Sequence, residues 1–334
     1  MRKYSLLLFL CALLVAGCSS GRPARFVTVP LGTEGGLADG NLTAYLLAVK
    51  GTSEYVALDA GTVLSGLKMA RDKGSFHDVK VPADADESLE GWVLRDRIKA
   101  YLLSHAHLDH VAGLIIGSTD DSPKPIVGLS STLDFLRDDV FNWKIWPNFG
   151  NEGLSPLNQY TYVRLQDGQR YAVPQTEMNV ELWPLCHSNC YPSSAFLIEA
   201  RGYHVLYLGD TGPDEVEQTD RLHSLWTRLA PLVREGKLCG MFIEVSYPDG
   251  RSDDQLFGHL TPSWLMKELQ RLAVLVDPEH PDRALRGLTV VVTHIKPSLQ
   301  KGPSPRETIA AQLKQQNTLG VRFVLPEQGL RIEL

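Results

Sequence analysis

The strongest constraint on the fold is where seven histidine and aspartate side chains stand relative to the predicted strands. Each lies at the carboxyl end of an apolar run typical of a β-strand. Because these ends of strands lie along one edge of a layered α/β fold, residues distant in sequence can meet there. The seven residues are His105, His107, Asp109, His110, His187, Asp210 and His294. They predict a layered α/β protein with a polar site at one sheet edge.

Strands and helices alternate along the chain without an internal repeat or a low-complexity linker. The predicted strands span 43–49, 54–60, 99–104, 125–130, 160–165, 178–185, 193–200, 203–210, 238–246 and 288–295. The predicted helices span 214–233, 262–276 and 304–320, and 71–92 and 117–124 are predicted as surface loops. Two β-rich halves with helices favour a four-layer αββα sandwich. Composition alone leaves a doubly wound sheet open.

The first seventeen residues, MRKYSLLLFLCALLVAG, predict a secretory signal peptide because a basic start precedes a short apolar run and small residues. The ending VAGC resembles the bacterial lipobox, so we expect Cys18 to be acylated and residues 18–25 to form a lipidated tether. The protein would then be periplasmic or held at the cell envelope. The alternative is a plain signal peptide in which Cys18 is incidental.

The net charge and the number of cysteines limit which partners and which disulfide bonds the protein can have. The chain of 334 residues has a net charge of −6, which removal of Arg2 and Lys3 would make more negative. Since no basic run stands out, a nucleic-acid polymer is an unexpected partner. Few cysteines remain after Cys18, which excludes a disulfide framework. Cys186 and Cys190 could pair across a turn beside His187, and the sequence leaves that bond open.

Imidazole and carboxylate ligands without thiolates suit zinc, with manganese or iron as alternatives. One ion needs only three protein ligands, whereas seven candidates are present. His105, His107 and His187 make one set, and a second set consists of Asp109, His110 and His294. Asp210 is left to bridge two divalent ions, a pair that suits phosphoryl displacement. Taken alone, the His105–His110 stretch would also fit a single ion bound by His105 and His107, with Asp109 and His110 supporting these ligands without binding the metal.

The order of these motifs resembles the metallo-β-lactamase fold superfamily. The motifs of that superfamily occur here in the same order along the chain: LDAG (58–61), HAHLDH (105–110), the lone His187, GDT (209–211) and TH (293–294). This resemblance implies a single metallo-hydrolase domain over 26–334. A metallo-β-lactamase typically has cysteine where Asp210 stands. The resemblance also implies that Asp59 supports the metal site, although it could simply form a turn before Gly61.

Further stretches are similar to the class II cyclic-nucleotide phosphodiesterases: GGLADGNLTAYLL (35–47), HSNCYPSSAFLI (187–198), YLGDTGPD (207–214) and EVSYPDG with FGHLTP (244–262). The resemblance implies hydrolysis of a 3′,5′-cyclic nucleotide to the 5′-nucleotide by a metal-bridging hydroxide, with cyclic AMP ahead of cyclic GMP. The alternatives are a hydrolase of the same fold that acts on another phosphodiester, a sulfate ester or a lactone, and a non-catalytic metal-binding lipoprotein.

Glu244 and His259 are comparable to a pair in the tRNA 3′-processing enzymes. An ionised group on the apolar run LCGMFIEVS needs a partner, which Glu244 could find in His259. The resemblance implies that His259 protonates the leaving oxygen and Glu244 orients it. With Asp109, which is also a metal ligand, these are the expected catalytic residues. Ser193 and Ser194 are expected to start a strand and the aromatic stretch 141–146 to pack in the core, although they could contact phosphate and base.

Overall fold

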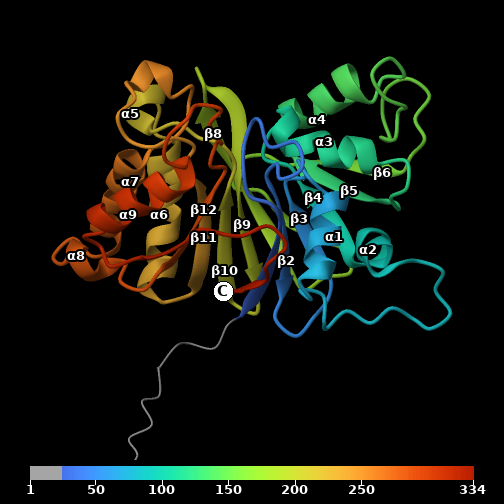
Figure 1. The fold of residues 1–334 in the computed structure, drawn as a ribbon, viewed down its shortest axis with the longest axis horizontal. Coiled ribbons are helices and arrows are strands. Elements are labelled where there is room, and N and C mark those ends of the chain that lie inside the picture. Colours follow the sequence, from blue (N-terminus) through green and yellow to red (C-terminus); the bar gives the residue numbers. More distant parts are fainter. Residues whose placement is uncertain (1–24) are drawn as a thin grey trace, which may run out of the picture.

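Two seven-stranded sheets face each other at the centre of the molecule (Figure 1). The computed structural model describes residues 25–334. The first sheet has the order β14–β1–β2–β3–β4–β5–β6 and contains β1 (Phe26–Gly32), β2 (Ala44–Val49), β3 (Tyr55–Leu58), β4 (Ile98–Leu102), β5 (Lys124–Gly128), β6 (Tyr160–Arg164) and β14 (Ile332–Glu333). The second has the order β13–β12–β11–β10–β9–β8–β7 and contains β7 (Arg170–Ala172), β8 (Asn179–His187), β9 (Tyr191–Ala200), β10 (Tyr203–Leu208), β11 (Leu238–Glu244), β12 (Thr289–Thr293) and β13 (Arg322–Val324).

Both sheets are mixed. In the first, β3, β4, β5 and β6 run parallel, and in the second β10, β11, β12 and β13 do so. The remaining neighbours pair antiparallel, including the predicted hairpin of β2 and β3. Since parallel strands share one direction, the carboxyl ends of β10, β11 and β12 reach the same end of the second sheet. His105, which follows β4, lies 3.9 Å from Asp210, which follows β10, so the carboxyl end of β4 meets them there.

The strands are apolar on both faces because each sheet is covered twice. In β9, Phe196 and Ile198 pack between the sheets, whereas Ala195 and Leu197 join the core under the helices. Successive strand residues point to opposite faces, so this alternation buries both sets. Figure 1 shows the helices on the two outer sides of the sheets. The expected four-layer αββα fold is therefore confirmed.

The helices fall into two groups. On the first sheet's side are α1 (Leu64–Asp72), α2 (Leu89–Trp92), α3 (Leu108–Gly117) and α4 (Ser130–Phe135). On the second sheet's side are α5 (Asp214–Glu217), α6 (Arg221–Arg234), α7 (Pro262–Val276), α8 (Pro281–Ala284) and α9 (Pro305–Gln316). Within residues 25–334, no helix is both long and apolar enough to cross a membrane.

Two helix predictions differ from the structure. The predicted helix 214–233 is broken into α5 and α6 because Gln218 adopts a left-handed conformation with φ 53°. The predicted helix 304–320 ends four residues early, at Gln316. The 71–92 segment also contains α2, whose start is capped by the Ser88 side chain. The predicted signal peptide and Cys18 lie outside the described residues.

Candidate metal centre

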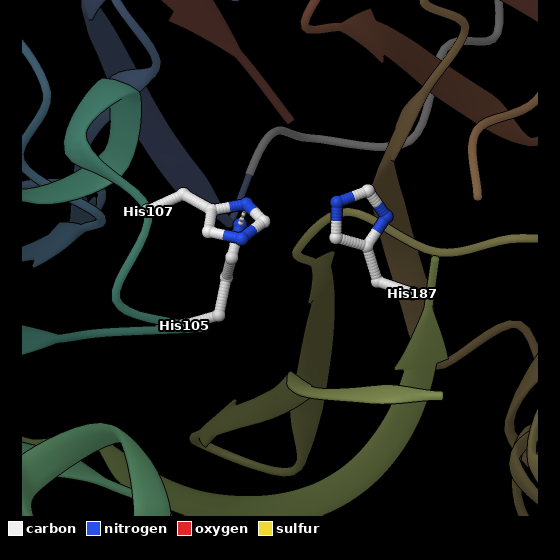
Figure 2. A group of neighbouring side chains, drawn as sticks. All are labelled: His105, His107 and His187. Atoms are coloured by element: carbon white, nitrogen blue, oxygen red, sulfur yellow. Dashed lines mark hydrogen bonds between the residues drawn. The ribbon is translucent and has the colours of Figure 1, made fainter. Parts of the chain in front are cut away.

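The first predicted ligand set combines residues from both sheets. His105 and His107 follow β4, and His187 is the last residue of β8. Figure 2 shows the His105 and His107 rings on one side and the His187 ring opposite them. One nitrogen from each ring lies within 4.8 Å of the other two. Burial holds the pKa of His105 well below its usual value, which keeps this imidazole neutral as metal binding requires.

The second predicted set lies directly beside the first. Nε2 of His294 lies 3.1 Å from Oδ2 of Asp109, and the Asp109, His110 and His294 donor atoms lie within 4.8 Å of one another. Asp210 sits between the sets: its Oδ2 is 3.2 Å from His294, 3.3 Å from His110 and 3.9 Å from His105. The structure therefore brings all seven predicted ligands together.

Hydrogen bonds to the ring nitrogen that faces away from the cluster orient two of these imidazoles. Nδ1 of His187 donates to the Gly258 carbonyl at 2.8 Å, which leaves Nε2 free to coordinate. Nδ1 of His110 contacts Asp59, while its buried Nε2 has no hydrogen-bond partner. A buried ring nitrogen that faces a carboxylate and other imidazoles without a hydrogen bond suits a cation ligand. The clusters are thus consistent with a binuclear metal site.

Glu244 and His259 form a buried pair next to the ligands. Nδ1 of His259 lies 2.6 Å from Oε1 of Glu244 and 3.8 Å from Oδ2 of Asp210. Burial raises the pKa of Glu244 to about 7 and lowers the pKa of His259 to about 4. Both shifts disfavour an ionised Glu244 carboxylate beside a charged His259 imidazolium, so the pair holds a single proton between them. The predicted partnership is present, and the donor atoms of His259 also group with those of His187 and Asp210.

Two residues of the site have a strained backbone. His294 has φ 56° and Asp59 has φ 53°, a conformation that costs energy for residues with a Cβ. Gly35 lies against the His294 ring: a Cβ at that position would approach the ring's atoms to 2.2–2.5 Å. Glycine is therefore the residue that lets the 33–36 segment pass beside this ligand.

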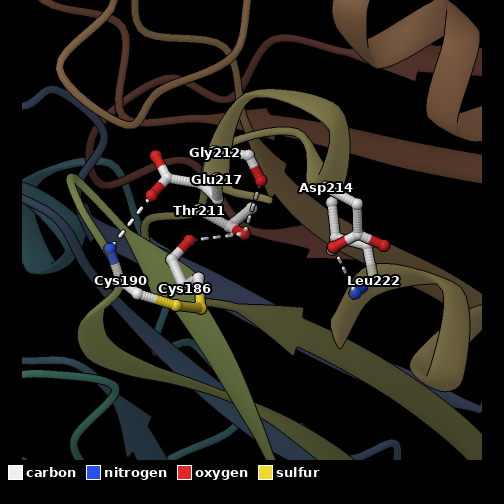
Figure 3. The surroundings of a disulfide bond; sticks show 7 residues. All are labelled: Cys186, Cys190, Thr211, Gly212, Asp214, Glu217 and Leu222. Carbon is white, nitrogen blue, oxygen red and sulfur yellow. Dashed lines mark hydrogen bonds between the residues drawn. A yellow bond between two sulfur atoms is a disulfide. The ribbon is translucent and has the colours of Figure 1, made fainter. Parts of the chain in front are cut away.

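The bond that the sequence left open is present, as Cys186 is joined to Cys190 (Figure 3). The disulfide encloses His187 and a tight turn. The Cys186 carbonyl accepts hydrogen bonds from Thr211 Oγ1 and the Gly212 amide, and the Cys190 amide donates to Glu217 at 3.0 Å. These contacts tie the His187 turn to the segment that follows Asp210.

The structure also tests the predictions for Ser193, Ser194 and the aromatic stretch. Ser194 Oγ donates to the Ser104 carbonyl, a structural contact, whereas buried Ser193 Oγ has no partner. Phe141 of the aromatic stretch is fully buried, as expected for core packing, but Trp143 and Ile145 are exposed, so the core prediction is wrong for those two residues. Sequence reasoning did not single out Ser246, whose Oγ lies 2.7 Å from Glu244 and 3.0 Å from Nδ1 of His294. A lone serine after a strand offers no signal of such a role.

A family model for class II cAMP phosphodiesterases matches residues 24–329 of the chain. This chain belongs to the class II cAMP phosphodiesterase family. Its sequence is 47% identical to a 3′,5′-cyclic-nucleotide phosphodiesterase of Aliivibrio fischeri, over 93% of each protein. The resemblance inferred from the motifs is thereby confirmed.

Solved structures place this class II phosphodiesterase in the metallo-β-lactamase fold. Unliganded yeast PDE1 superposes with a TM-score of 0.78 at 23% identity, over 93% of this chain and 100% of that one. The metallo-β-lactamase fold protein YhfI from Bacillus subtilis gives a TM-score of 0.59 at 14% identity, over 93% and 99%. At these identities the likeness concerns the fold alone.

Proposed function

We propose that this protein hydrolyses 3′,5′-cyclic nucleotides to 5′-nucleotides, with cyclic AMP as the leading substrate and cyclic GMP as the second. The observation that carries the proposal is the pair of three-residue clusters on either side of Asp210, with Glu244 and His259 at their edge. Membership of the class II family supports the phosphodiester as substrate. The relative in Aliivibrio fischeri carries this activity in its name.

The site would hold two divalent cations, and zinc is the expected ion because every ligand is an imidazole or a carboxylate. His105, His107 and His187 would hold one, and Asp109, His110 and His294 the other, with Asp210 shared. When bound, such a pair supplies a nucleophilic hydroxide at neutral pH and neutralises phosphoryl oxygens. The protein contributes the fixed geometry, through the hydrogen bonds behind His110 and His187.

His259 would donate a proton to the departing 3′ oxygen. Its Nδ1 faces Glu244 at 2.6 Å, so Nε2 is the atom left for the substrate. As Nε2 gives up its proton, Nδ1 can take the one shared with Glu244, and no net charge is left on the imidazole. Ser246 holds Glu244 in place with its amide and its hydroxyl, at 3.1 and 2.7 Å.

The test is a substrate panel on the metal-loaded protein. Cyclic AMP, cyclic GMP, a linear phosphodiester, a lactone and a β-lactam would be assayed in parallel, with the nucleotide product identified by chromatography. We expect 5′-AMP from cyclic AMP at the highest kcat/KM. Turnover of the lactone or the β-lactam alone would contradict the proposal, and so would release of 3′-AMP.

We further infer that the protein is a lipoprotein of the cell envelope, anchored through Cys18. Support comes from the sequence, in which a short apolar run ends in VAGC. Mass spectrometry of the mature protein from a bacterial host should find a diacylglyceryl-modified Cys18 as the first residue. An unmodified N-terminus beyond Cys18 would refute the anchor.

A further inference from the structure

A row of stacked rings extends outward from the metal-ligand cluster on the side of His107. Tyr191, the first residue of β9, stacks on the His107 imidazole with ring centroids 4.5 Å apart and planes at 21°. Phe135, the last residue of α4, stacks on Tyr191 at 5.9 Å and 9°. The row therefore leads from a proposed metal ligand to a second and then a third aromatic ring.

The outer end of this row is open to solvent. Phe135 is 38% exposed and Tyr191 is half-buried. Phe135 belongs to the helical layer on the first sheet and Tyr191 to the second sheet, so the stacked pair joins the two halves of the sandwich beside the site. An accessible aromatic face in such a place suits a planar ligand.

We propose that the outer face of Phe135, whose inner face Tyr191 supports, is the surface on which the purine base of the cyclic nucleotide stacks. This inference rests on the proposed function. With the phosphate at the metal ligands, the base lies one ribose away, so a base-binding ring must stand just beyond the ligands. Tyr191 touches a ligand ring, and Phe135 stands one ring farther out. Any base can stack on such a face because every base presents a π surface.

Other aromatic residues are less suited to this role. Phe141 is buried against Phe149 and Tyr160, so no face is free. Phe257, which precedes Gly258 beside His187, is exposed but stacks on no ring of the ligand cluster. Tyr247 lies near His259, but the guanidinium of Arg251 covers its ring at 4.0 Å. Among these rings, Phe135 combines exposure with a stacked connection to the ligand cluster.

The experiment compares cyclic AMP with ribose 3′,5′-cyclic phosphate, which carries the same phosphodiester without a base. In the metal-loaded Phe135→Ala variant, KM for cyclic AMP should rise about tenfold, the effect of losing one base–aromatic stack. KM for the base-free ester should stay within about twofold. Phe135→Tyr, which keeps an aromatic face, should recover the affinity for cyclic AMP, whereas Phe135→Leu should not.

Ile116→Ala is the matched control, because Ile116 is an exposed apolar residue near the far end of α3. It should leave both KM values unchanged. Equal rises in KM for the two substrates, or full affinity for cyclic AMP in Phe135→Leu, would overturn the stacking role. If the wild-type protein hydrolysed neither substrate, the proposed function would fail, and the inference would fall with it.

Discussion

Nδ1 of His110 lies 2.8 Å from Oδ2 of Asp59, and Nε2 of the same ring lies 3.3 Å from Oδ2 of Asp210. One buried carboxylate thus receives the ring's N–H, while the other nitrogen faces the proposed metal position. Asp59 also accepts hydrogen bonds from the Ser104 amide and hydroxyl and from the Tyr207 hydroxyl. Asp59 therefore fixes both the tautomer of His110 and the loop that carries His105.

We expect Asp59→Asn to weaken metal binding by about 10- to 100-fold, the usual effect of losing a carboxylate behind a ligating histidine. Chelator competition would measure the affinity, and circular dichroism would check the fold. Tyr207→Phe is the control, because it removes one donor to Asp59 and leaves the His110 contact in place. Wild-type metal affinity in Asp59→Asn would show that the carboxylate does not orient His110.

Replacing His259 with asparagine should lower kcat for cyclic AMP by about 10²- to 10⁴-fold, as expected when a general acid is lost. Bound metal should not change. Bis(4-nitrophenyl) phosphate has a leaving group that needs no proton, so the variant's activity on this substrate should fall far less. Equal losses on both substrates together with a fall in metal content would instead make His259 a ligand, in line with its position beside His187 and Asp210.

Glu244→Gln tests the positioning of that acid. The amide keeps the size of the side chain but cannot supply the shared proton, so kcat for cyclic AMP should fall and the pH profile should change shape. Activity on bis(4-nitrophenyl) phosphate should again be affected less. An unchanged pH profile would mean that Glu244 acts only in packing around Ser246.

Gly35→Ala should displace the His294 ring, because the added Cβ would meet it within 2.5 Å. The second ligand set would then lose occupancy, and metal content by mass spectrometry should fall from two ions toward one. Gly40→Ala is the matched control, since a Cβ at Gly40 has nothing within 4 Å. Two tightly held ions in Gly35→Ala would show that the ring can move without loss of binding.

Removal of metal should destabilise the fold, because the ions bind the folded chain and not the unfolded one. At a thousandfold excess of zinc over its Kd, each site adds about 4 kcal/mol to the free energy of unfolding. Differential scanning fluorimetry should therefore show a Tm that falls with a chelator and recovers with zinc. Calcium, which prefers oxygen ligands, should not restore it. A Tm insensitive to chelator would argue against ions at this cluster.

The sequence predicted the parts of the site that carry local signals. HAHLDH and the apolar run that ends at His294 indicated candidate ligands that the structure brings together, since clustered histidines and strand ends leave a pattern in a few residues. The row from His107 to Phe135 left none, because stacking depends on how α4 and β9 meet across two layers. The strand β1 was missed for a different reason: Pro30 interrupts its pattern, and β14, one of its two partners, lies at the far end of the described chain.

The proposed ligands come from both sheets, which has a consequence for the order of folding. A chain emerging from the ribosome presents His105, His107, Asp109 and His110 first, long before Asp210 and His294. The early residues alone offer a loose chelate, because the shared carboxylate and the last imidazole are still missing. Tight metal uptake should therefore be among the last steps of maturation, and a tightly held ion pair would report that the two halves of the sandwich have docked.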